Sequence, residues 1–188
     1  MIDLDALLRD SRVIPALRDT RDLDAALAAP ARLVWVLTGE IGGIADVLAR
    51  LNAARKTACV NLDLVAGLSG DSAAVRYLAR CGAHGVISTH APVLKAAQGL
   101  GLVAVQRTFL LDSQALATAR RSVERFVPDA VEVLPAPVAG RAIAPLRAIA
   151  PTLPIIAGGL VGSLAEVDQL VRAGIDAVSA SESTLWVV

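Results

Sequence analysis

The segment PIIAGGLVGSLAEVDQLVRAGIDAVSA, Pro154–Ala180, contains one complete strand–helix–strand unit. Its ends, Pro154–Ala157 and Ala177–Ala180, are short apolar runs with the length of a buried strand. The stretch between them starts with Ser163 and Glu166, whose spacing is that of a capping box at the beginning of a helix. It continues with apolar residues that fall on one helix face: Leu164, Val167, Leu170 and Val171. The unit therefore predicts two parallel strands joined by a helix.

The same alternation runs along the whole chain. Eight apolar runs suit strands: Val13–Leu17, Leu33–Leu37, Ala58–Leu62, Gly85–Ser88, Leu102–Arg107, Ala130–Leu134, Pro154–Ala157 and Ala177–Ala180. Strands that are apolar throughout are covered on both faces, as parallel strands are. Eight such strands favour a closed TIM-type (β/α) barrel. An open, flavodoxin-like sheet is the alternative.

Residues 1–188 are expected to form a single (β/α)-barrel domain, because no linker rich in proline and glycine interrupts the alternation. The sequence stops soon after the last predicted strand, so the barrel should be compact, with its last helix missing or truncated. Asp3–Arg9 is expected to form a helix that shields either an exposed sheet edge or the barrel floor.

Composition narrows the class of protein. Because the formal net charge is +0, the protein has no overall electrostatic attraction to nucleic acid or to an anionic membrane. A local basic patch is still compatible with this net charge. Cys59 and Cys81 are too few for a disulfide scaffold and lack the spacing of zinc ligands. The chain shows neither a signal peptide nor an apolar run long enough to span a membrane. We therefore expect a cytoplasmic protein that does not contact membranes.

The binding site of a parallel barrel forms at the C-terminal ends of its strands. Gly158 and Gly159 end the seventh predicted strand, just before the helix capped by Ser163. Glycine lets backbone N–H groups approach an anion, and a helix N-terminus adds positive potential. Together with Ser181 after the eighth strand, the pattern predicts a phosphate site. For the two glycines alone, a tight turn is the alternative.

Charged residues at the other strand ends are candidates for holding the rest of a ligand. Arg107 ends a buried strand and needs an anionic partner, which is a ligand, Glu132 on the adjacent strand, or both. Asp63 and Glu132 suit hydrogen bonds to the hydroxyls of a polyol, and their alternative role is a general acid–base pair. Arg18 is either a ligand for phosphate or carboxylate, or a solvated loop residue.

No residue is assigned a catalytic role. A Schiff-base enzyme needs a lysine in the barrel mouth, but Lys56 precedes the third strand and Lys95 lies in a predicted helix. His90 stands alone at the mouth, so the sequence predicts neither a metal site nor another cofactor. The surviving enzyme hypothesis is a sugar-phosphate isomerase or lyase that uses Asp63 and Glu132.

Several motifs occur in a characteristic order along the chain. They are VIPALR (Val13–Arg18), LTGEI (Leu37–Ile41), DLVAGLSGD (Asp63–Asp71), GVIST (Gly85–Thr89), GLVAVQRTFLLDSQAL (Gly101–Leu116), VEVLP (Val131–Pro135), IIAGGL (Ile155–Leu160) and AVSAS (Ala177–Ser181). With these motifs the chain closely resembles the glycerol-3-phosphate-responsive antiterminator family, from about Val13 to Trp186. The combination of QR-x-F-L-x-DS-x-AL, IAGGL and the terminal Leu185-Trp186 is specific, whereas AGG alone recurs in many phosphate-binding barrels.

The resemblance implies a non-enzymatic barrel that binds glycerol 3-phosphate and then acts on leader mRNA to prevent premature transcription termination. The ligand-binding residues that it implies are Arg18, Asp63, Arg107, Glu132, Gly158, Gly159 and Ser181. This chain departs from the family pattern in having Asn61 for histidine, His90 for arginine and Ala136 for glycine. A related polyol phosphate is therefore also a candidate ligand.

Three hypotheses follow: a ligand-responsive RNA regulator, a sugar-phosphate isomerase or lyase, and a module that binds another protein. The chain carries no motif of a standard RNA-binding module, so leader mRNA as a partner rests on the resemblance alone. The best local basic patches are Arg120, Arg121 and Arg125, where Arg121 and Arg125 share one helix face, and the similar pair Arg76 and Arg80. For both patches a solvated helix face is the alternative. Association with a second copy in a homo-oligomer is the other partner left open.

Overall fold

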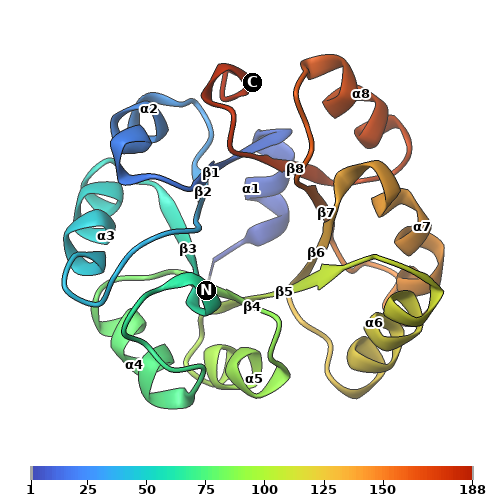
Figure 1. The fold of residues 1–188 in the computed structure, drawn as a ribbon, viewed down its shortest axis with the longest axis horizontal. Helices are drawn as coiled ribbons and strands as arrows, with labels where there is room; N and C mark the ends of the chain where they lie inside the picture. The colour runs from blue at the N-terminus through green and yellow to red at the C-terminus, as the bar shows by residue number, and fades with distance from the viewer. Residues whose placement is uncertain (1, 188) are drawn as a thin grey trace.

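The computed structural model describes residues 2–187. Eight parallel strands form a closed barrel in chain order, and β8 pairs with β1 to close it (Figure 1). This confirms the TIM-type barrel and rules out the open sheet. The strands are β1 Val13–Leu17, β2 Leu33–Val36, β3 Thr57–Asn61, β4 Gly85–Ser88, β5 Val103–Phe109, β6 Ala130–Leu134, β7 Ile155–Gly158 and β8 Ala177–Ala180.

Seven helices connect successive strands and form the outer layer of the barrel (Figure 1). They are α2 Leu23–Ala28, α3 Ile44–Ala53, α4 Ser72–Arg80, α5 Ala91–Gly99, α6 Ser113–Arg125, α7 Ala136–Arg147 and α8 Leu164–Arg172. Asp71, Asp112 and Ser163 cap α4, α6 and α8 with their side chains, which satisfies N–H groups that the first helical turn leaves unpaired. Within residues 2–187, no helix has both the length and the apolar character needed to cross a bilayer.

The helix α1, Leu4–Asp10, closes the floor of the barrel. Its buried side chains Leu4, Leu7 and Leu8 belong to the same apolar cluster as residues inside the barrel, including Ile14 and Trp35. Figure 1 shows α1 within the ring of strands. Of the two roles expected for the N-terminal segment, the structure therefore shows the floor.

The same end of the barrel holds Lys56. Its ammonium group donates to the carbonyl oxygens of Ala29 and Ala31, and burial lowers the pKa of this lysine. Cys59 is fully buried inside the barrel, where burial raises the pKa of its thiol. Neither group faces the C-terminal mouth as a nucleophile.

The end of the described chain takes the place of an eighth crossover helix. After β8 there is only a short 3-10 turn, Ser183–Leu185, followed by Trp186. Leu185 and Trp186 are buried in the outer core, and the indole Nε1 of Trp186 donates to the carbonyl oxygen of Ala180 at 2.7 Å. Within residues 2–187 no α-helix follows β8, and a tryptophan covers the apolar surface there.

We expect Trp186→Ala to lower the free energy of unfolding by about 3–5 kcal/mol, because a large buried side chain and its hydrogen bond are lost. Chemical denaturation followed by far-UV circular dichroism measures the change. Val187→Ala is the control, since Val187 is exposed. Equal losses for the two variants would show that Trp186 does not replace the helix.

Candidate functional site

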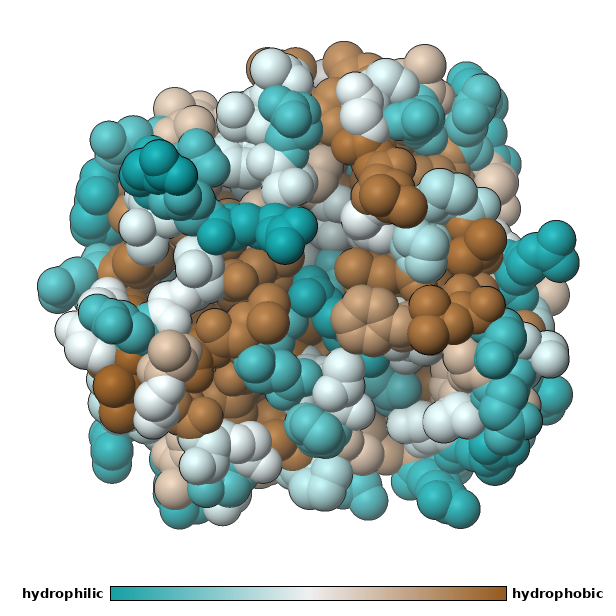
Figure 2. Space-filling view, viewed as in Figure 1, coloured by the Kyte–Doolittle hydropathy of each residue, from teal (hydrophilic) through white to brown (hydrophobic). Residues whose placement is uncertain are grey.

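A cavity of about 360 Å³ opens at the C-terminal ends of the strands. Five of the seven predicted site residues line it: Arg18, Arg107, Glu132, Gly159 and Ser181. Apolar side chains, including Leu64, Phe109 and Leu160, form the rest of its rim. Figure 2 shows hydrophilic atoms at the centre of this face with hydrophobic patches around them.

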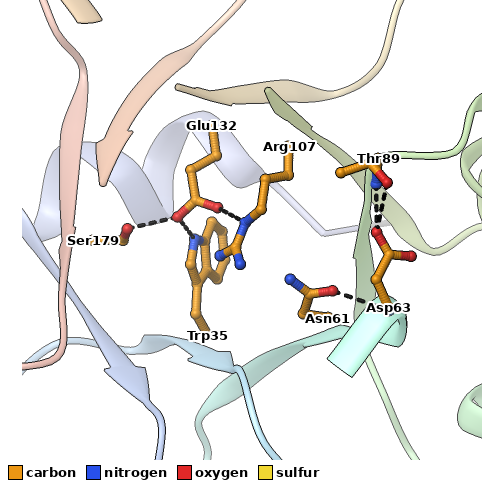
Figure 3. Close-up of polar contacts among 7 residues, drawn as sticks. All are labelled: Trp35, Asn61, Asp63, Thr89, Arg107, Glu132 and Ser179. Carbon is orange, nitrogen blue, oxygen red and sulfur yellow. Dashed lines mark hydrogen bonds and ion pairs between the residues drawn. The ribbon is translucent and has the colours of Figure 1, made fainter. Parts of the chain in front are cut away.

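A buried ion pair forms the inner wall of the cavity. The Nε atom of Arg107 donates to Oε2 of Glu132 at 2.7 Å, and the two side chains are 8% and 0% exposed. Trp35 Nε1 and Ser179 Oγ donate to Oε1 of Glu132 at 3.0 Å and 2.6 Å (Figure 3). These three bonds replace the water that the carboxylate loses on burial, so the charge is tolerated inside the barrel.

The backbone places these partners together. Arg107 and Glu132 occupy paired positions in the register of β5 and β6. Gly158, at the end of β7, leaves room for the network, because a Cβ atom there would lie 2.5 Å from Ser179 Oγ and 3.1 Å from Glu132 Oε1. The structure thus gives Gly158 a packing reason to lack a side chain, independent of any ligand.

Two guanidinium groups offer free donors to the cavity. Among residues 2–187, Arg18 has no hydrogen bond or ion pair to its side chain, and Arg107 uses only its Nε atom. The neighbouring Asp19 does not compete for Arg18, because it binds Arg21. Hydrogen bonds from Arg21 lower the pKa of Asp19 to about 2. An anion in the cavity would therefore meet two cations with free donors, one without any side-chain partner in the described chain and one bound only through Nε.

The loop after β7 differs from the sequence-based expectation. Gly159 and Leu160 both have left-handed backbone angles, with φ of 75° and 59°. The carboxylate of Glu166 accepts the N–H groups of Gly162 and Ser163 at 2.7 Å and 3.1 Å, so the start of α8 is already occupied. The backbone N–H groups of Leu160 and Val161, which line the cavity, have no hydrogen-bond partner within residues 2–187. Successive backbone N–H groups in a turn can form a concavity that suits an anion.

Asp63 lies apart from this cavity. Its carboxylate accepts bonds from Ser88 Oγ at 2.7 Å and from the N–H and Oγ1 of Thr89 at 2.7 Å and 2.9 Å. These bonds tie the 3-10 turn Leu62–Leu64 to the loop after β4 (Figure 3). The structure therefore brings Asp63 to the barrel mouth as an anchor between two loops.

The three departures from the family pattern lie in different places. Asn61 ends β3 and is 1% exposed. His90 is exposed and precedes α5, while Ala136 is buried at the start of α7 and donates its N–H to the carbonyl oxygen of Gly159 at 3.1 Å. Only Asn61 is buried close to the ion pair (Figure 3).

Sequence reasoning missed the role of Trp35 and did not single out Ser179 as a partner of Glu132. A tryptophan in an otherwise aliphatic strand is a usable signal, since a buried indole N–H requires an acceptor. Its acceptor lies 97 positions away in the chain, which no local pattern reveals. In the described part of the chain, no group of three or more His, Cys, Asp or Glu residues could hold a metal ion.

The fold and the cavity define a small TIM-type barrel with a cationic pocket at its mouth. Residues 13–186 match the family model described as glycerol-3-phosphate responsive antiterminator, and the chain belongs to this family. The uncharacterized Escherichia coli (strain K12) protein YgcP is 32% identical over 184 residues, which are 96% of this chain and 94% of YgcP.

Two solved structures support the same relationship. A glycerol uptake operon antiterminator-related protein from Thermotoga maritima is 30% identical with a TM-score of 0.84, covering 94% of this chain and 98% of that one. A glycerol uptake operon antiterminator regulatory protein from Listeria monocytogenes is 27% identical with a TM-score of 0.86, covering 93% and 94%. Solved aldolases, at identities between 12% and 17%, share the fold alone.

We expect Glu132→Gln to lower the free energy of unfolding by about 3 kcal/mol or more, because it leaves the buried guanidinium of Arg107 without its counter-charge. The double variant Arg107→Met/Glu132→Gln should recover part of that loss. Glu124→Gln is the matched control, since it breaks the exposed pair of Glu124 with Arg120 and should cost under about 1 kcal/mol. A loss for Glu132→Gln no larger than for the control would contradict the account.

Proposed function

We propose that this chain is a ligand-responsive regulator that binds glycerol 3-phosphate, or a closely related polyol phosphate, at the barrel mouth. The observation that carries the proposal is the pair of guanidinium groups of Arg18 and Arg107, which line one cavity and keep donors free. Family membership supports glycerol 3-phosphate as the ligand. In the bound form the protein would act on leader mRNA as an antiterminator.

The phosphate would lie against the loop after β7. There the backbone N–H groups of Leu160 and Val161, the exposed guanidinium of Arg18 and the hydroxyl of Ser181 line the cavity. Donors of these kinds bind phosphate oxygens well, and a concave loop holds them in place without a large loss of entropy. Gly159 supports this arrangement by adopting the left-handed conformation that a side chain would strain.

A sugar-phosphate isomerase or lyase is the competing function, and the contacts of the two carboxylates argue against it. Glu132 is fully buried and accepts three hydrogen bonds, and Asp63 accepts three more outside the cavity. A general base needs a lone pair within reach of the proton that it removes. The Schiff-base route lacks a lysine at the mouth, because Lys56 binds carbonyl groups at the floor. In this proposal the carboxylates of Glu132 and Asp63 hold neighbouring protein groups in place and do not act as an acid–base pair.

Action on RNA rests on the family and on one surface. On α6, Arg120 pairs with Glu124, whereas Arg121 and Arg125 are exposed and lie on one helix face. α7 packs beside α6 and adds the exposed Arg141 (Figure 1). On a protein with no net charge, this surface is where an RNA backbone would be held most favourably.

Arg107→Lys should weaken glycerol 3-phosphate binding about tenfold or more, because lysine keeps the charge but loses the planar fork. Isothermal titration calorimetry measures the affinity, with unphosphorylated glycerol as the ligand control. Arg80→Lys is the control variant, since Arg80 is exposed on α4. Unchanged affinity combined with a large drop in Tm would make Arg107 a purely structural residue.

Replacing Arg121 and Arg125 with Glu should lower the affinity for the cognate leader RNA without changing glycerol 3-phosphate binding. The loss should be nearly independent of RNA sequence and should shrink at high salt, because phosphate contacts release counterions. Gel shifts across a salt series, with and without ligand, measure it. Arg76→Glu/Arg80→Glu on α4 makes the same charge change elsewhere. Full RNA affinity after the α6 double change would place the interface outside α6.

A further inference from the structure

Two unpaired hydrogen-bond donors, carried by the side chains of Asn61 and Arg107, face the same space at the barrel mouth. Asn61 is 1% exposed, and its Oδ1 accepts the backbone N–H of Asp63 at 3.0 Å. This bond fixes the orientation of the amide, so Nδ2 points the other way. Figure 3 shows that Nδ2 and the guanidinium of Arg107 both point into the space between β3 and β5.

Neither donor has a partner in the described part of the chain. No hydrogen bond within residues 2–187 uses Asn61 Nδ2 or the two terminal nitrogens of Arg107. The nearby carboxylates are already engaged: Glu132 by Arg107 Nε, Trp35 and Ser179, and Asp63 by Ser88 and Thr89. Neither donor is among the side-chain atoms that are both fully buried and unpaired, so a ligand can reach them, and they converge from two different strands. Their natural complement is an acceptor oxygen.

We propose that this donor pair is a subsite for an oxygen that carries no hydrogen, supplied by a carboxylate or a ketone of the ligand. The inference rests on the phosphate site of the proposed function, because the phosphate would hold the other end of the same molecule. The preferred ligand is then a three-carbon phosphate in which one alcohol carbon is oxidised. Glycerol 3-phosphate itself binds, but more weakly.

The chemistry of hydroxyl groups explains the preference. A hydroxyl oxygen can accept from Asn61 Nδ2 or from Arg107, but its own hydrogen then also needs an acceptor. Glu132 is fully buried and already accepts three bonds, so it cannot readily serve that hydrogen. A ketone oxygen accepts without this demand. A carboxylate does the same and can take both terminal nitrogens of Arg107.

The test is calorimetric titration of the whole protein with glycerol 3-phosphate, dihydroxyacetone phosphate and 3-phosphoglycerate. These compounds share the phosphate and differ in the oxidation of one carbon. We expect at least one oxidised compound to bind about tenfold more tightly than glycerol 3-phosphate. Comparing dihydroxyacetone phosphate with 3-phosphoglycerate shows whether a ketone or a carboxylate supplies the acceptor oxygen.

Asn61→Asp tests the subsite itself. Aspartate keeps an oxygen to accept the N–H of Asp63 but replaces the amide donor with an anion, so the preference for oxidised ligands should be lost. Gln169→Glu makes the same chemical change at an exposed position of α8 and should keep the preference. Thermal unfolding of both variants checks that they remain folded.

The outcomes separate this inference from the proposed function. If glycerol 3-phosphate binds as tightly as both oxidised compounds, the subsite is wrong and the phosphate site stands. If the preference survives in folded Asn61→Asp, Asn61 does not form the subsite. If none of the three compounds binds, the proposed function fails and the inference fails with it.

Discussion

The buried ion pair between Arg107 and Glu132 is the constraint on which the barrel mouth depends. A carboxylate that is 0% exposed must have every lost water contact replaced, and Arg107, Trp35 and Ser179 supply the replacements. The same need explains why Gly158 has no side chain, since a Cβ would collide with this network. Hydrogen bonds thereby tie strands β2, β5, β6 and β8 together at one point.

The ion pair also determines which hydrogen-bond donors of Arg107 stay available to a ligand. Glu132 binds the Nε side of Arg107 and so directs the terminal nitrogens into the mouth (Figure 3). A guanidinium that is fixed on one edge has little rotamer freedom left to lose when its other edge binds a ligand. The carboxylate thus positions the cation, while Arg18 and the loop after β7 supply further donors to the same cavity.

The fold was largely predictable because it depends on local patterns. The runs Gly85–Ser88 and Ala130–Leu134 form strands with the predicted bounds, and the capping box of Ser163 and Glu166 begins α8 as expected. The bounds shift where tertiary pairing extends a strand beyond its apolar run, as in β5, which continues to Phe109. The local sequence gives no information about that pairing.

The site was predictable only in part, for a related reason. Residue type and strand position placed Arg18, Arg107, Glu132, Gly159 and Ser181 at the mouth, and these residues line one cavity. Residue type and strand position could not show that Asp63 binds Ser88 and Thr89, or that the carboxylate of Glu166 accepts the backbone N–H groups just before α8. Which donor a carboxylate takes depends on distances across the barrel, and those follow only from the closed fold.

The most direct measurement is a crystal structure of the protein grown with glycerol 3-phosphate. The account predicts the phosphate against the loop Gly159–Val161 and beside Arg18, with the bond from Arg107 Nε to Glu132 intact and the terminal nitrogens of Arg107 turned to the ligand. A phosphate bound elsewhere on the molecule, or a ligand that displaces Glu132 from Arg107, would contradict it.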